Sequence, residues 1–290
     1  SDLGRLADAN DLKGVIDQAD YAVWRANFGN AAPAAGSSSQ QLALGVDEMP
    51  VAAPATAAVL SPAAVDAALH RGCHAIIVTP RAQNPTGAAL SQPRAEELRQ
   101  VLRRFPQLVL IENDYGGPVA GTPFHTLRSP SHGRWVVVRS LSSFLGPDLR
   151  VAVLAGDDVT IARVRGRQAL GARWVSHILQ QLALALWADP SSGRRIARAG
   201  EIYGHRRTAL LAALSAHGIA AHGRSGFNVW VPVRNEGSVI RGLAESGWAV
   251  AAGGRFRIQA GPGIRITTST LLREDAVLCA ADLARLAGPA

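Results

Sequence analysis

The chain has 290 residues, with 30 basic residues against 22 acidic ones and a formal net charge of +8. Its 48% share of hydrophobic residues is typical of a folded globular protein and excludes a disordered chain. The positive charge permits contact with nucleic acid or an anionic ligand without requiring either. This length favours one large α/β domain, or a large and a small domain, with a substantial core.

Cysteine content and hydropathy indicate the cellular compartment in which the chain is expected. Cys73 and Cys279 are the only cysteines, and neither has a partner at a spacing that binds metal. Isolated thiols of this kind are typical of a reducing compartment. No apolar run reaches the roughly 18 residues of a membrane span, and residues 1–30 lack the layout of a signal peptide. We therefore expect a soluble, cytoplasmic protein without membrane contact and without a bound metal.

The N-terminal segment, residues 1–58, differs in character from the rest of the chain. Its acidic residues between Asp8 and Asp20 loosely resemble a calcium loop of the dockerin or EF-hand kind, but their spacing is out of register. A stretch rich in Ala, Pro and Ser follows, which is typical of a linker. We favour an appended segment and linker over a calcium-dependent scaffold module.

From Ser61 onward, short apolar runs alternate with helical patterns. Ser61 and Pro62 form an N-cap and first-turn pair for a helix that ends at His70. Strands are expected at Ala75–Val78, Leu108–Ile111, Trp135–Val138 and Val151–Leu154, with a helix at about Pro93–Arg104. The alternation predicts the α/β class, with a mostly parallel sheet covered on both faces.

The second half of the chain is richer in helical patterns. We expect one long helix over about Val159–Ala188, which would cross from a large to a small domain, and a second helix over Arg194–His217. Further strands are expected near Phe227–Val233, Trp248–Ala251 and Ile264–Thr267. These elements predict a large domain over residues 59–190 and a smaller C-terminal α+β domain over residues 191–290.

Polar residues follow three of the predicted strands. Asn84 comes after the first strand, and the group Asn113, Asp114 and Tyr115 comes after the second. The third strand leads into SLSSFLGPDLR, which begins at Ser140. Ligands of α/β folds bind at the C-terminal ends of the strands. Hydroxyl groups followed by an arginine, here Arg150, are suited to holding a phosphate.

Four phrases stand in a characteristic order: TPRAQNPTG, RSLSSFLGPDLR, GARWVSHILQ and GIRITTSTL. With IENDYGG, they resemble the pyridoxal-phosphate-dependent aminotransferases of class I/II, which have fold type I. The closer resemblance is to the aminotransferase-like effector domain of MocR-type regulators of the GntR family, in the pyridoxine-associated branch. It covers roughly Val46–Leu286. It implies a homodimer, a B6 vitamer or amino acid as ligand, and DNA contact only through a winged-helix domain that is missing from this sequence.

The resemblance also assigns roles to the ring-facing residues. Asn84 and Tyr115 match the residues near the ring hydroxyl of pyridoxal phosphate. The acid that keeps the pyridine nitrogen protonated matches either Asp114 or, by the spacing of the MocR relatives, Asn113. An asparagine could not stabilise the pyridinium as a carboxylate would. Both assignments stay open at this point.

Two further assignments concern phosphate and substrate. Ser140, Ser142 and Arg150 match the phosphate-binding residues. Arg265, in GIRITTSTL, matches the residue that binds a substrate carboxylate.

One departure from the family pattern bears directly on activity. Ser143 stands where the family has the lysine that forms the Schiff base, and Lys13 is the only lysine of the chain. A hydroxyl group cannot form an imine, so covalent catalysis is not expected. We expect a non-catalytic or degenerate effector domain that binds pyridoxal phosphate non-covalently. The alternatives are an active aminotransferase in which Ser143 replaces the lysine, and a basic nucleic-acid-binding module.

Overall fold

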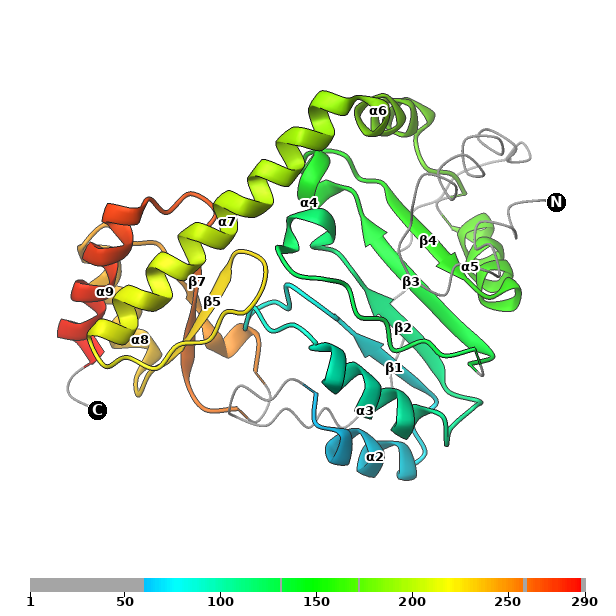
Figure 1. Ribbon diagram of the computed structural model, residues 1–290, viewed down its shortest axis with the longest axis horizontal. Coiled ribbons are helices and arrows are strands. Elements are labelled where there is room, and N and C mark those ends of the chain that lie inside the picture. Colours follow the sequence, from blue (N-terminus) through cyan, green and yellow to red (C-terminus); the bar gives the residue numbers. More distant parts are fainter. Residues whose placement is uncertain (1–59, 131, 172, 258–259, 288–290) are drawn as a thin grey trace.

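The computed structural model describes residues 60–130, 132–171, 173–257 and 260–287. Figure 1 shows two lobes, each built on its own β-sheet, with the long helix α7 (Pro190–Ala216) running from one to the other. The predicted appended segment and linker, residues 1–58, lie outside the described residues.

The larger sheet confirms the predicted α/β class. Its strands are β1 (Ala75–Val78), β2 (Val109–Asn113), β3 (Arg134–Ser140) and β4 (Ala152–Gly156), in that order across the sheet. The pairs β1–β2 and β2–β3 are parallel, whereas β4 is antiparallel to β3. The sheet is therefore mostly parallel, and the polar residues that follow β1, β2 and β3 are all delivered to one edge.

Two helices cover one face of this sheet. They are α2 (Pro62–His70) and α3 (Gln92–Leu102), and the Ser91 side chain caps α3 by accepting a hydrogen bond from the Arg94 backbone. The core between helices and sheet contains Leu69, Leu98, Leu102, Leu110, Leu127, Trp135 and Val137. On the opposite face, α5 (Asp158–Leu170) contacts β3 and β4. Among the described residues, Ile77 of β1 stays 67% exposed on that face.

The prediction of one helix over Val159–Ala188 is wrong, because the structure divides this stretch into α5 and α6 (His177–Ala188). Gly171 ends α5, and Arg173 adopts a positive φ of 62°, which a helix cannot accommodate. Ser176 then caps α6 by accepting a hydrogen bond from the Leu179 backbone. The helix that crosses between the lobes is α7, which starts earlier than the predicted Arg194 because Asp189 caps it.

The smaller lobe is an antiparallel sheet packed against helices. Its strands are β5 (Asn228–Pro232), β7 (Gly263–Thr267) and β6 (Ala251–Ala252), in the order β5–β7–β6. Helices α8 (Glu236–Glu245) and α9 (Arg273–Ala287) complete the lobe, with α9 packed along α7. The predicted strand at Trp248–Ala251 is only partly right, since β6 begins at Ala251. Trp248 instead packs at the core and donates to Asp282.

Three short helices complete the described elements. They are η2 (Gly117–Ala120), α4 (Ser142–Leu145) and η3 (Gly253–Arg255). In the part of the chain that the structure describes, no helix is both long and apolar enough to cross a membrane. The same residues contain no cluster of three or more histidine, cysteine or acidic side chains that could hold a metal ion.

Candidate ligand site

The loop between β1 and α3 carries Asn84 and is fixed by contacts with the smaller lobe. The Gly87 carbonyl accepts hydrogen bonds from the Arg224 and Ser225 backbones, at 2.8 Å each. Gly87 has a φ of +61°, and a Cβ atom there would lie 2.4 Å from the Asn228 carbonyl oxygen. Only glycine fits this position, so the NPTG sequence serves the close approach of the two lobes.

Three predicted site residues meet on one side of the strand ends. Arg265 of β7 donates from Nη1 to Asn84 Oδ1 at 3.0 Å. The Arg265 guanidinium lies over the Phe256 ring, at 5.0 Å from its centroid. Tyr115 lies close enough for Arg265 to act on its pKa, which burial raises and Arg265 lowers, with burial the larger effect. We call Asn84, Tyr115 and Arg265 the open group.

The open group has unused hydrogen-bonding capacity. Asn84 is exposed, and Arg265 is half-buried. The Nε of Arg265 is nevertheless buried and has no hydrogen-bond partner among the described residues. Unpaired buried donors are rare in folded proteins, and a bound ligand or water is one partner that would satisfy this one. The Tyr115 hydroxyl donates to the Ala82 carbonyl.

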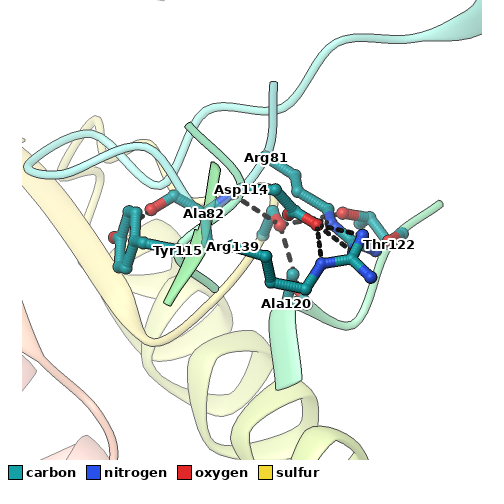
Figure 2. A network of polar contacts seen from close by, with 8 residues as sticks. Arg81, Ala82, Asp114, Tyr115, Ala120, Thr122 and Arg139 are labelled. Atoms are coloured by element: carbon teal, nitrogen blue, oxygen red, sulfur yellow. Dashed lines mark hydrogen bonds and ion pairs between the residues drawn. The ribbon is translucent and has the colours of Figure 1, made fainter. Parts of the chain in front are cut away.

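The other side of the strand ends holds a different arrangement, which we call the two-arginine cluster. Asp114 is fully buried and accepts from Arg81 Nε at 2.7 Å and from Arg81 Nη2 at 2.9 Å. Arg139 of β3 donates from Nε to the same carboxylate at 2.9 Å, with its Nη2 at 2.6 Å. Figure 2 shows this cluster directed away from the Tyr115 ring.

A second buried acid lies beside the cluster. Glu112 of β2 is 1% exposed and accepts hydrogen bonds from the Thr126 hydroxyl and the Leu127 backbone. Burial raises the Glu112 pKa to about 7, and the nearby Asp114 carboxylate adds to this rise, although the Thr126 and Leu127 hydrogen bonds oppose it. Glu112 is therefore protonated in a substantial share of molecules at neutral pH.

Ser225 joins the smaller lobe to both arrangements. Its buried hydroxyl accepts from the Ala82 backbone at 3.0 Å and donates to the Ala120 carbonyl at 2.9 Å. It also lies 2.8 Å from the Thr122 hydroxyl. Because the Ala82 carbonyl accepts from Tyr115 while the Ala82 N–H donates to Ser225, the backbone of Ala82 connects the open group to the smaller lobe.

The predicted phosphate residues lie on α4 and the turn after it. Ser140 ends β3, and its hydroxyl accepts from the Ser142 backbone at 3.3 Å. The Ser142 hydroxyl donates to the Leu149 carbonyl, and Ser143 is half-buried within α4. Arg150 is exposed.

The structure thus brings Asn84, Tyr115 and Arg265 together, and it directs Asp114 to the opposite side. For Asn113, the strand geometry decides between the two sides, because neighbouring residues of a strand point to opposite faces. Glu112 and Asp114 both point to the buried face, so Asn113 points to the face of the open group.

Sequence reasoning missed three residues that organise the site: Arg81, Arg139 and Ser225. A signal for Arg139 was present, since it interrupts the apolar run WVVVRS and a charge within a buried strand requires a partner. For Ser225 no local signal exists, because its partners are more than 100 residues away in the chain.

A large α/β lobe with ligand-type residues at the ends of a mostly parallel sheet, joined by a long helix to a small α+β lobe, defines the pyridoxal-phosphate-dependent aminotransferase fold, fold type I. The model of the aminotransferase class I and II family matches residues 53–281. The chain belongs to that family. Pyridoxal phosphate is the cofactor that this membership supports.

Two curated proteins are similar to the chain in sequence. The chain is 39% identical over 226 residues to the vitamin B6 salvage pathway transcriptional repressor PtsJ of Salmonella typhimurium, over 77% of this chain and 53% of PtsJ. It therefore spans about half the length of that curated relative. The aminotransferase tdiD of Emericella nidulans is 26% identical over 155 residues, which are 49% of this chain and 35% of tdiD.

Solved structures share the fold. A variant of Thermus thermophilus aspartate aminotransferase matches with a TM-score of 0.67 and 21% identity, over 78% of this chain and 63% of that one. The kynurenine aminotransferase of Pyrococcus horikoshii, solved in complex with PMP, matches with a TM-score of 0.63 and 18% identity, over 73% of this chain and 55% of that one. Both likenesses concern the fold alone.

Proposed function

We propose that this chain is a ligand-sensing domain of a transcription regulator, and that it binds pyridoxal phosphate without a covalent bond. Membership of the aminotransferase family supports the cofactor. The relationship to PtsJ, which is named a repressor of a vitamin B6 salvage pathway, supports a B6 vitamer as the signal. On this proposal, DNA contact belongs to a separate domain of the regulator.

The single observation that carries the non-covalent assignment is the serine at position 143. The family's Schiff-base lysine matches this position, and the chain's only lysine is Lys13. A serine hydroxyl cannot condense with the aldehyde of pyridoxal phosphate to form an imine. The residues of this site therefore fit a vitamer that is bound non-covalently, and they do not fit one that is bound covalently to the protein.

The open group has the chemistry to hold the ring of the vitamer. The Tyr115 hydroxyl and the Asn84 amide are suited to the ring hydroxyl, and the unpaired Nε of Arg265 supplies a donor for a carboxylate. Ser140, Ser142 and Arg150 are the candidates for the phosphate, with Arg150 exposed and able to reach an anion. A bound vitamer supplies an aldehyde and an electron-accepting ring, and these residues would orient it.

The test is an absorbance titration of the purified chain with pyridoxal phosphate, run beside a Ser143→Lys variant. Each sample is then reduced with borohydride and its intact mass is measured. We expect saturable binding by both chains and a stable adduct only on the lysine variant. An adduct on the unmodified chain would overturn the non-covalent assignment. Failure of both chains to bind would overturn the ligand assignment.

We also propose that the domain forms a homodimer through the end of α5, the turn after it and the start of α6. Leu170, Trp174 and Ile178 are 82%, 58% and 80% exposed, which is unusual for large apolar side chains. Ile178→Glu should shift the molar mass from dimer to monomer in light scattering. Val277→Glu, on the exposed side of α9, is the matched control and should leave the mass unchanged. A monomeric unmodified chain would overturn the proposal.

A further inference from the structure

We propose that the site takes its pyridine ligand with an uncharged ring nitrogen, read by the amide of Asn113 and not by a carboxylate. The inference rests on the proposed function and adds the charge state that the ligand must have. It settles which of the two neighbouring residues, Asn113 or Asp114, faces the ring, and it identifies Asn113 as a specificity-determining residue.

The first step concerns the acid. Asp114 lies between the last residue of β2 and Tyr115. Both of its carboxylate oxygens accept hydrogen bonds from Arg81 and Arg139. The side chain is fully buried. Removing it from this cluster would leave two buried guanidinium groups without a partner, at a large cost in free energy. Asp114 therefore cannot serve a ring on the opposite side of the strand.

The second step concerns the residue that does face the ring. Asn113 is the last residue of β2 and pairs with Val138 of β3. Strand alternation sends its side chain to the face opposite Glu112 and Asp114, where the open group lies. An amide can donate a hydrogen bond to the lone pair of an unprotonated pyridine nitrogen. Donation to the neutral form favours that form over the pyridinium.

The third step concerns the surrounding charge. Arg81 and Arg139 share one carboxylate, so the two-arginine cluster carries one excess positive charge. The neighbouring Glu112 is buried and hydrogen-bonded to neutral donors, and its raised pKa of about 7 limits the negative charge that it contributes. This cluster lies on the opposite side of the strand end from the open group, and its single carboxylate is used by the two arginines, so it offers no negative charge that would stabilise a pyridinium.

The consequence is a site built to recognise a vitamer and not to activate it. A protonated ring nitrogen is what makes pyridoxal phosphate an effective electron acceptor. With Asn113 at the ring, this acceptor strength is reduced independently of Ser143. The two departures from the family, Ser143 and Asn113, therefore act on different steps and favour the same outcome.

The experiment uses pyridoxal phosphate labelled with ¹⁵N at the ring nitrogen, bound to the unmodified chain and to two variants. Asn113→Asp introduces a carboxylate, and Asn113→Ser removes the amide without adding charge. The ¹⁵N chemical shift at mildly acidic and neutral pH reports ring protonation. We expect an unprotonated ring in the unmodified chain, a larger protonated fraction in Asn113→Ser because the amide donor is lost, and a fully protonated ring in Asn113→Asp.

A second measurement does not depend on a variant that folds. N-methylated pyridoxal phosphate carries a fixed positive charge on its ring, and it should bind the unmodified chain at least about tenfold more weakly than pyridoxal phosphate. Equal affinity, or a protonated ring in the unmodified chain, would overturn this inference and leave the proposed function intact. Absence of any binding would overturn the proposed function and this inference with it.

Discussion

The two sides of the β2 strand end differ in how their polar groups are used. On one side, Arg81, Asp114 and Arg139 satisfy one another in a buried cluster. On the other, Asn84 is exposed and Arg265 keeps a buried donor without a partner in the described residues. A satisfied buried network needs no further partner, whereas an unpaired buried donor calls for one, which a ligand can supply. Burial and charge alone would have selected the two-arginine cluster, whereas the function proposed above uses the open group.

The largest effect on stability is expected from Asp114→Asn, which disrupts the two-arginine cluster. The substitution removes the charge that pairs two buried guanidinium groups, so we expect a loss of about 3–5 kcal/mol in the free energy of unfolding. Urea denaturation followed by circular dichroism measures the change. Asp148→Asn, at an exposed position, is the control and should change stability by less than about 0.5 kcal/mol. A mild effect at Asp114 would mean that the cluster is not a structural element.

The second prediction uses the raised pKa of Glu112. The folded chain binds the Glu112 proton more tightly than the unfolded chain, because burial raises the pKa from 4.5 to about 7. Its contribution to stability is therefore largest at low pH and is lost as the pH rises from about 4.5 to about 7. Glu112→Gln removes this loss and should be more stable than the unmodified chain above pH 7, by roughly 3 kcal/mol.

The measurement for Glu112→Gln is urea denaturation across this pH range. The advantage of the variant should grow between the two pKa values and then stay constant. Glu97→Gln, on the exposed surface of α3, is the control and should show no such growth. A constant difference at all pH values would contradict a raised Glu112 pKa.

The third prediction concerns the hydrogen bonds by which Ser225 of the smaller lobe contacts the larger lobe. Ser225→Ala leaves the Ala82 N–H without its acceptor and removes the donor to the Ala120 carbonyl. We expect a loss of about 1–3 kcal/mol, because an unsatisfied buried donor costs that much. Ser238→Ala, whose hydroxyl is exposed on α8, should have almost no effect. Equal effects at the two positions would argue against a role for Ser225 in the contact between the lobes.

The smallest effect is expected on the open side. Tyr115→Phe removes the hydroxyl proposed for the ring of the vitamer and should weaken pyridoxal phosphate binding by roughly fivefold to tenfold, with a loss of about 0.5–1.5 kcal/mol in stability from its hydrogen bond to the Ala82 carbonyl. Isothermal titration calorimetry measures the affinity. Tyr203→Phe retains the ring contact with Phe227 and should leave the affinity unchanged. Unaltered affinity in Tyr115→Phe would remove Tyr115 from the proposed site.

The sequence predicted the large sheet well because its strands are short apolar runs that follow helical patterns. The same approach failed at Val159–Ala188, where apolar content continues through a break that depends on the backbone at Arg173 and the cap at Ser176. It placed Asn84, Tyr115 and Arg265 in one site through motif order. It left Asn113 and Asp114 undecided, because the choice depends on Arg81 and Arg139, which lie 33 and 25 residues from Asp114 in the chain.

The most direct test of the contrast is a crystal structure of the chain with pyridoxal phosphate. We expect the ring on the side of Asn84 and Tyr115, with Asn113 at the ring nitrogen, no continuous density to Ser143, and the two-arginine cluster unchanged. A ring whose nitrogen contacts Asp114, or a vitamer bound away from the open group, would contradict the account.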